Sequence, residues 1–86
     1  MTTALPMSTL DRSLLRARCT VTGVRAPERA PEWAQWLEEI GFLPGEQVQL
    51  LARSALGGHS LVVRVGLSTF ALRQAEAACV LVESSV

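Results

Sequence analysis

Residues 31–50 combine an apolar helix face, a glycine stop, a tight turn and the start of a strand, and this order constrains the fold most. The helix face has large apolar side chains at the i, i+3, i+4 and i+7 positions, which are Trp33, Trp36, Leu37 and Ile40. Pro31 suits the first helical position because its missing N–H needs no partner there. Gly41 follows the face, where the chain must turn left-handed. We expect at least one tryptophan in the core, with a partly exposed partner contact as the alternative.

The helix is followed by a turn and a half-buried strand. Pro44-Gly45 fits the central positions of a type II turn, because proline presets φ and glycine supplies a positive φ. Phe42 and Leu43 precede this turn, and we expect both to pack beneath it. Apolar and polar side chains then alternate through residues 46–53, which predicts a strand with one buried face.

The remaining pattern predicts a mainly β chain. We expect five strands, at residues 19–24, 46–53, 61–65, 67–72 and 79–83, and a helical turn over 73–78. Thr9 begins a short turn that carries Leu10, Leu14 and Leu15, and residues 1–8 are expected to fray. The predicted architecture is a small five-stranded barrel with one helix after the first strand and a helical turn before the last. Pairing of the fifth strand with the first would remove exposed edges.

Length and charge limit the function classes. The 86 residues allow one domain. The 8 basic residues balance 8 acidic ones, so the chain lacks the excess of positive charge that is typical of nucleic-acid-binding proteins. We interpret Arg16, Arg18 and Arg25 as a solvated surface, with a phosphate-binding patch as the alternative. The first nine residues lack the pattern of a signal peptide, and no apolar run could span a bilayer. We expect a cytoplasmic protein whose two cysteines are reduced.

Two motifs resemble those of the FeoA family, the small ferrous iron transport protein A. The first motif follows the predicted helix and contains Gly41, Leu43, Pro44 and Gly45. The second contains Gly66, Ala71, Leu72, Arg73, Glu76 and Ala77, with Val80 and Val82 after it. The resemblance covers residues 10–84 and implies an SH3-like β-barrel, which we expect as a single domain over residues 9–84. The family usually has a glycine-containing turn before the first strand, where this chain has Arg16-Ala17-Arg18.

The resemblance also implies a function. FeoA proteins are thought to act on FeoB, the membrane ferrous iron transporter with a cytosolic G-protein domain. The chain would then dock on and activate FeoB at the inner-membrane face, through its G domain or its membrane domain, without entering the bilayer. The alternative is a regulatory SH3-like module that acts with an iron-dependent repressor. The residues expected to contact a partner lie in loops and on the exposed helix side: Arg25, Glu28, Arg29, Gln35, Glu38, Glu39, Leu56 and His59.

Catalysis and tight metal binding are not predicted. His59 is the single histidine, and no nucleophile and base can be paired around it. No cofactor is required, and the cysteines and histidine have no chelating spacing. We expect Cys19 to share a face with Val21 and Cys79 to face away from Val80, so two unlinked small thiols are favoured over a built site. His59 and Cys79 remain candidates for a weak divalent-metal site, at the surface or between molecules of a weak homodimer.

Overall fold

A six-stranded sheet and two short α-helices make up the computed structural model, which describes residues 7–54 and 59–84. The elements are β1 (Met7–Thr9), the 3-10 turn η1 (Leu10–Arg12), β2 (Cys19–Val24), α1 (Glu32–Glu39), β3 (Gln47–Arg53), β4 (Ser60–Val65), β5 (Ser68–Arg73), α2 (Gln74–Ala77) and β6 (Val80–Ser84). The mainly β fold class is therefore confirmed. The described chain has one strand more than the five predicted, because β1 precedes them.

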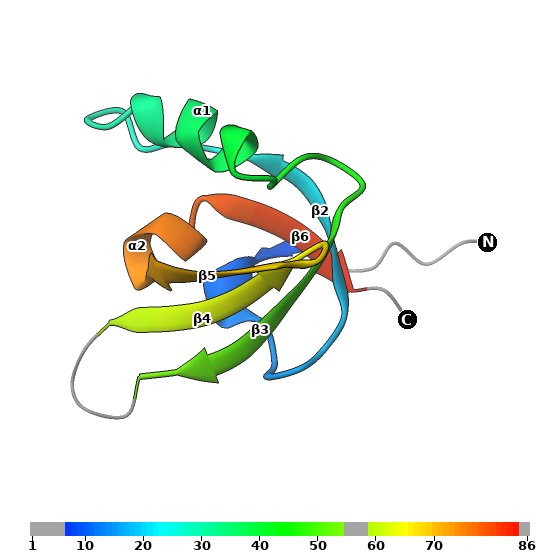
Figure 1. Cartoon of the computed structure of the whole chain (residues 1–86). Coiled ribbons are helices and arrows are strands. Elements are labelled where there is room, and N and C mark those ends of the chain that lie inside the picture. The colour runs from blue at the N-terminus through cyan, green and yellow to red at the C-terminus, as the bar shows by residue number, and fades with distance from the viewer. Residues whose placement is uncertain (1–6, 55–58, 85–86) are drawn as a thin grey trace.

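The sheet is antiparallel throughout, in the order β1-β6-β2-β3-β4-β5. β2 curves so that it pairs with both β6 and β3, and the predicted pairing of the last strand with residues 19–24 is confirmed (Figure 1). Irregular register between Val21 and Gly23, and between Leu50 and Ala52, marks where β2 and β3 bend. Within the described residues two edges remain, at β1 and β5, where closure was expected to remove them.

The start of the described chain differs from the prediction. Met7 and Ser8 were expected to fray, but they pair with Glu83 and Val82 as the first residues of β1. A segment of three residues is too short to show the alternating pattern that predicts a strand. It is a strand here because it pairs with the edge of β6. In the turn that follows, Leu10 is fully buried. Leu14 and Leu15, which the sequence placed on the same turn as Leu10, lie beyond η1 and are exposed.

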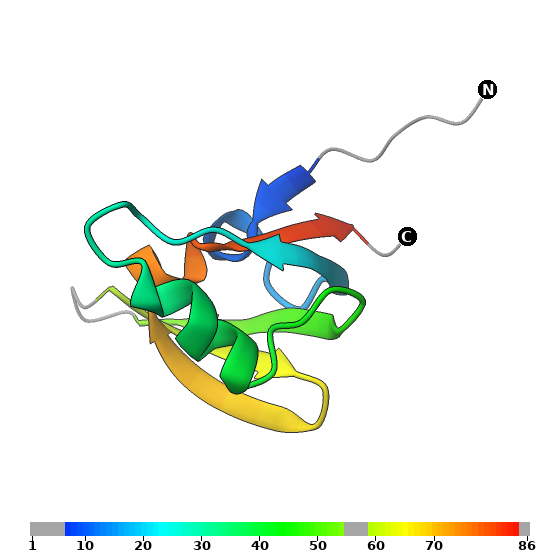
Figure 2. The ribbon, with the colours of Figure 1, turned by 90° about the horizontal axis from the view of Figure 1, so that it is seen from above.

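The core lies between the curved sheet and α1, which crosses above the sheet (Figure 2). Leu37 is the fully buried residue of α1, and Trp33 and Ile40 pack against the core as partly buried side chains. At least one tryptophan thus contacts the core, as predicted, whereas Trp36 is 37% exposed. The other buried apolar residues come mainly from the inward faces of the strands: Val21, Val48, Leu50, Leu61, Val63, Val65, Leu72, Val80 and Val82.

The Pro-Gly turn ties α1 to β2. Gly41 and Gly45 have φ of 124° and 93°, the left-handed backbone that the sequence predicted at both positions. The N–H of Gly45 donates to the carbonyl of Val21, and the N–H of Val21 donates to the carbonyl of Glu46, each at 2.8 Å. These bonds hold the turn against β2, and the two residues before it differ in burial. Phe42 is fully buried, and the prediction that its neighbour Leu43 packs beneath the turn is wrong, since Leu43 is 46% exposed.

Candidate functional site

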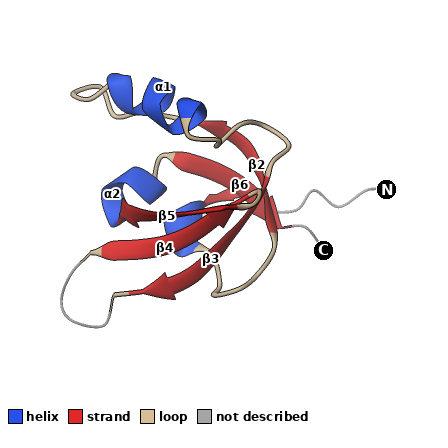
Figure 3. Ribbon diagram, in the orientation of Figure 1, coloured by secondary structure: helices blue, strands red, loops and turns tan. Residues whose placement is uncertain are grey.

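The short helix α2 joins β5 to β6 (Figure 3). Two hollows adjoin at this helix. Ala75 and Ala78 line both hollows, so we treat them as one surface, called here the α2 groove. The first part has a volume of about 640 Å³ and is also lined by Asp11, His59, Ser60, Arg73 and Gln74. The second has about 590 Å³ and is also lined by Arg25, Ala26, Pro27, Arg29, Ala30, Trp33 and Cys79. We call these parts the His59 end and the Trp33 end.

The Trp33 end has an apolar floor and a basic rim. The loop between β2 and α1 is held in place by the N–H of Arg25, which donates to the carbonyl of Cys79 at 2.7 Å. The backbone N–H of Trp33 donates to the carbonyl of Ala30 at 3.1 Å, which ties the start of α1 to this loop. Arg25 and Arg29 are exposed, and neither guanidinium has an ion-pair partner among residues 7–54 and 59–84. This end therefore offers a fixed apolar surface beside two free positive charges.

The His59 end is built on the start of α2. The N–H of Gln74 donates to the carbonyl of His59 at 2.6 Å, which joins the helix to the segment before β4. The carboxylate of Glu76 accepts a hydrogen bond of 2.7 Å from the backbone N–H of Arg73. The contact that the structure shows between these two motif residues is therefore a capping bond at the helix start. The backbone of Arg73 and the side chain of Glu76 thus fix the start of α2, on which the His59 end is built.

The structure brings together some of the residues expected to contact a partner and separates others. Arg25, Arg29 and His59 line the α2 groove. Four more are exposed but line neither part of it: Glu28, Gln35, Glu38 and Glu39. Leu56 lies outside the described residues. Trp33 had a partner contact only as the alternative to a core position, and Ala75 and Ala78 were not predicted as groove residues. The alanine-rich composition of residues 75–78 was a signal for them, because small exposed side chains leave a hollow.

The candidate metal ligands do not form a metal centre in the described part of the chain. No group of three His, Cys, Asp or Glu side chains converges there. His59 is exposed, whereas Cys79 is 5% exposed and its thiol contacts the carbonyl of Ala75 at 3.4 Å. Burial, and then the negative charges of Glu76 and Asp11, raise the pKa of the Cys79 thiol. A protonated thiol is a poor ligand, because metals bind the thiolate.

The two cysteines occupy separate buried positions. Cys19 and Val21 are both buried on the inner face of β2, as expected, and the Cys19 thiol lies 3.7 Å from the Ser13 hydroxyl. Cys79 was expected to face away from Val80, yet both are buried, because Cys79 belongs to the turn before β6 and not to the strand. Both thiols are free. Among the described residues, none of the helices has the length and apolar composition needed to cross a membrane.

Comparison with known proteins identifies the family. The family model for the FeoA domain matches residues 9–84. No curated protein matches the chain. Among solved structures, FeoA of Stenotrophomonas maltophilia, determined in complex with zinc, is 37% identical, with a TM-score of 0.77 over 87% of this chain and 88% of that one.

Two further structures share the fold at lower identity. A FeoA-like protein from Clostridium acetobutylicum is 18% identical, with a TM-score of 0.76 over 93% of this chain and 88% of that one. A manganese-dependent transcriptional repressor is 22% identical, with a TM-score of 0.75 over 95% of this chain but 44% of that one. The expected SH3-like fold is confirmed by these matches. With a family model covering most of its length and a zinc-bound FeoA of the same fold, the chain belongs to the FeoA family.

Proposed function

We propose that this chain is an accessory binding module of ferrous iron uptake that docks on a FeoB-type transporter and promotes its activity. Membership of the FeoA family over residues 9–84 carries the proposal. The related S. maltophilia FeoA is described as a candidate ferrous iron transport activating factor, which supports the same role here. The module acts by surface contact and catalyses no reaction itself.

The α2 groove is the surface proposed for docking. Aromatic residues and arginine are enriched in protein interfaces and dominate their binding energy. Trp33 provides the aromatic surface, and Arg25 and Arg29 provide positive charges that no described acidic residue neutralises. Backbone hydrogen bonds already fix the loop that carries them, so less conformational entropy is lost on binding.

The setting of this interaction follows from the proposed partner. The module would be cytoplasmic and would bind at the inner-membrane face, on the G domain or the membrane domain of the transporter, without entering the bilayer. It requires no cofactor and no nucleic acid. A divalent metal would be held only weakly, through the exposed His59 at the surface or between two molecules of a weak homodimer.

Calorimetric titration with the cytosolic domain of a FeoB-type transporter, in its GDP, GTP-analogue and nucleotide-free states, tests the proposal. Trp33→Ala should weaken binding roughly tenfold or more, because it removes the aromatic floor. Trp36→Ala is the matched control, since Trp36 lies on the same helix but lines no part of the groove. Arg29→Glu adds an exposed variant that leaves the core intact. Absence of binding in every nucleotide state, and to the full-length transporter in detergent, would contradict the proposal.

A second candidate function is supported by the match to metal-dependent repressors. The manganese-dependent repressor contains this fold in less than half of its length, so the fold occurs there as one part of a larger protein. By analogy, the chain would act as a regulatory module that contacts an iron-dependent repressor. Affinity purification of the tagged chain from cell extract distinguishes the two functions, because co-purification of a repressor in place of a transporter would favour the second.

A further inference from the structure

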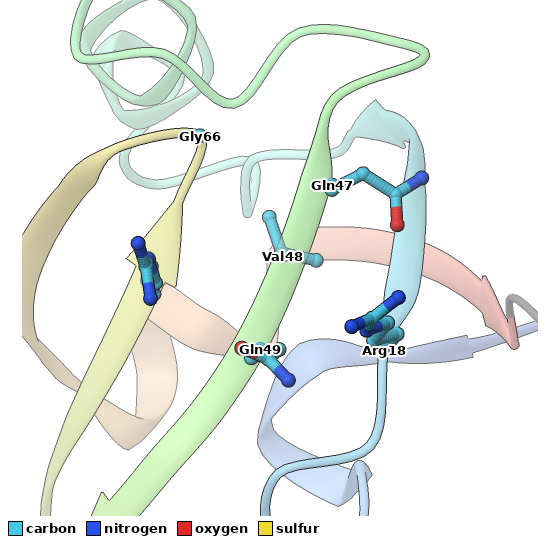
Figure 4. Close-up of a pocket in the computed structure, with 6 residues that line it drawn as sticks. Arg18, Gln47, Val48, Gln49 and Gly66 are labelled. Atoms are coloured by element: carbon cyan, nitrogen blue, oxygen red, sulfur yellow. The ribbon is translucent and has the colours of Figure 1, made fainter.

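A separate hollow lies on β3, and it shares no lining residue with the α2 groove. It has a volume of about 220 Å³ and is lined by Arg18, Gln47, Val48, Gln49, Arg64 and Gly66 (Figure 4). We call it the Arg18–Arg64 pocket. It is therefore distinct from the proposed docking surface.

The sheet places one arginine on each side of β3. Arg18 directly precedes β2, whose first residue, Cys19, pairs with Val48 of β3. Arg64 lies on β4, where it pairs with Gln49. Figure 4 shows Arg18, Gln47 and Gln49 arranged around Val48. Two positive side chains from distant parts of the sequence therefore flank residues 47–49 of β3, which contribute only neutral side chains to the pocket.

The charges of these two arginines are not compensated within the described residues. No Asp or Glu lines the pocket, and neither guanidinium has an ion-pair or hydrogen-bond partner in the part of the chain that the structure describes. The carboxylate of Glu46 lies beside Gly66, at the rim, with an oxygen 3.7 Å from where a Cβ on Gly66 would be. The pocket thus combines two unpaired cations with the carboxylate of Glu46 at its edge.

The glutamine side chains are held in place by bonds outside the pocket. The amide nitrogen of Gln47 donates to the hydroxyl of Thr20, and that of Gln49 donates to the carbonyl of Arg16, each at 2.9 Å. These bonds fix the amide groups and occupy one donor of each. The free donors in the pocket are then chiefly the N–H groups of Arg18 and Arg64, whose forked geometry matches the oxygens of a carboxylate or phosphate.

We propose that the Arg18–Arg64 pocket binds one small oxyanion, a phosphate or carboxylate group. An oxyanion between the arginines would neutralise their mutual repulsion and accept their free N–H groups. The sequence placed Arg16, Arg18 and Arg25 in one neighbourhood, but the fold puts Arg25 at the α2 groove and Arg18 in the same pocket as Arg64. Two cations fit a single anionic group and not a nucleic-acid backbone, which needs many phosphate contacts.

The test is an NMR titration of the full chain with inorganic phosphate or acetate, each compared with sodium chloride at the same ionic strength. We expect saturable shifts of the arginine Nε–H signals and of the amides of residues 47–49. Arg18→Gln and Arg64→Gln should each raise the dissociation constant about two- to fivefold, and the double variant should abolish saturation. Glu46→Gln should lower the dissociation constant, because the rim of the pocket loses its negative charge. Arg29→Gln, in the α2 groove, is the control and should change nothing.

The anions identify the ligand class. Saturable shifts with phosphate but not with acetate would identify phosphate as the ligand class. Equal shifts with acetate would show that a carboxylate group is sufficient for binding. Shifts no larger than those from sodium chloride with both anions would overturn the proposal. Unchanged dissociation constants in the two arginine variants would overturn it as well. No transporter takes part in this experiment, so its outcome is distinct from that of the docking experiment.

Discussion

The backbone N–H of Arg16 donates a 2.7 Å hydrogen bond to the carbonyl of Leu50, and Arg16 does so with a φ of 67°. Among the described residues, Arg16 is the one non-glycine residue that has a positive φ. Its own carbonyl accepts from the Gln49 side chain at 2.9 Å, so both sides of the residue are tied to β3. The family usually has a glycine-containing turn in this region, and Arg16 adopts the backbone conformation that glycine favours.

Arg16→Gly should therefore stabilise the protein. A left-handed backbone costs an L-residue about 1–2 kcal/mol, whereas glycine loses roughly 0.5–1 kcal/mol more conformational entropy on folding. The expected net change is an increase of up to about 1.5 kcal/mol in the free energy of unfolding, measured by urea denaturation. Arg16→Ala removes the same side chain but keeps the backbone strain, so it should give no increase. Equal stabilisation by both variants would attribute the effect to the side chain instead.

Adjacent residues at the end of α1 should differ sharply in their contribution to stability. Phe42 is fully buried, with its ring centroid 6.3 Å from that of Phe70, whereas Leu43 is 46% exposed. Phe42→Ala should lower the free energy of unfolding by about 3–5 kcal/mol, because it leaves a cavity in the core. Leu43→Ala should cost less than about 1 kcal/mol. Thermal and urea denaturation of both variants measure the difference, and similar losses would contradict the observed burial.

Local signals account for the parts of the fold that the sequence predicted. The Pro44-Gly45 turn, the glycine at the end of α1 and the alternation in β3 each depend on neighbouring residues, so they are visible in the chain itself. β1 was missed because its three residues become a strand only by pairing with β6, far along the sequence. The exposure of Leu43 was missed for a similar reason, since the turn is fixed by its bonds to β2.

The candidate site could be predicted only in pieces. Loop position alone indicated Arg25, Arg29 and His59, but their assembly into one groove depends on α2 lying between them. The Arg18–Arg64 pocket was not visible in the sequence, because β3 brings its two arginines together. Sheet topology determined both sites, and neither has a motif with fixed spacing.

The capping bond at α2 predicts a structural role for Glu76. Its carboxylate satisfies the N–H of Arg73 at the start of the helix, and such caps contribute about 1 kcal/mol. Glu76→Ala should lower the free energy of unfolding by this amount. Glu38→Ala, on the exposed side of α1, is the control and should change it by less than about 0.5 kcal/mol. If Glu76→Ala leaves stability unchanged but weakens partner binding, Glu76 contributes to contact and not to the helix start.

The buried thiol of Cys79 should make stability fall at alkaline pH. Burial first, then Glu76 and Asp11, raise its pKa above the ordinary value of 9.0. The folded state therefore keeps this proton longer than the unfolded state, so the stabilisation is fully present below pH 9.0 and is lost as pH rises through the folded-state pKa. All 8 basic side chains are arginine and tyrosine is absent, so few other groups titrate in this range.

Urea denaturation from neutral pH to well above 9.0 should show this decline in the wild type. Cys79→Ala should reduce the decline, because alanine has no proton to lose. Cys19→Ala serves as the control, since it removes the other buried thiol and leaves Cys79 in place. Because alanine at either position also removes core volume, the comparison is between the slopes of stability against pH and not between absolute values. Parallel slopes for the wild type and Cys79→Ala would show that this thiol titrates alike in the folded and unfolded states.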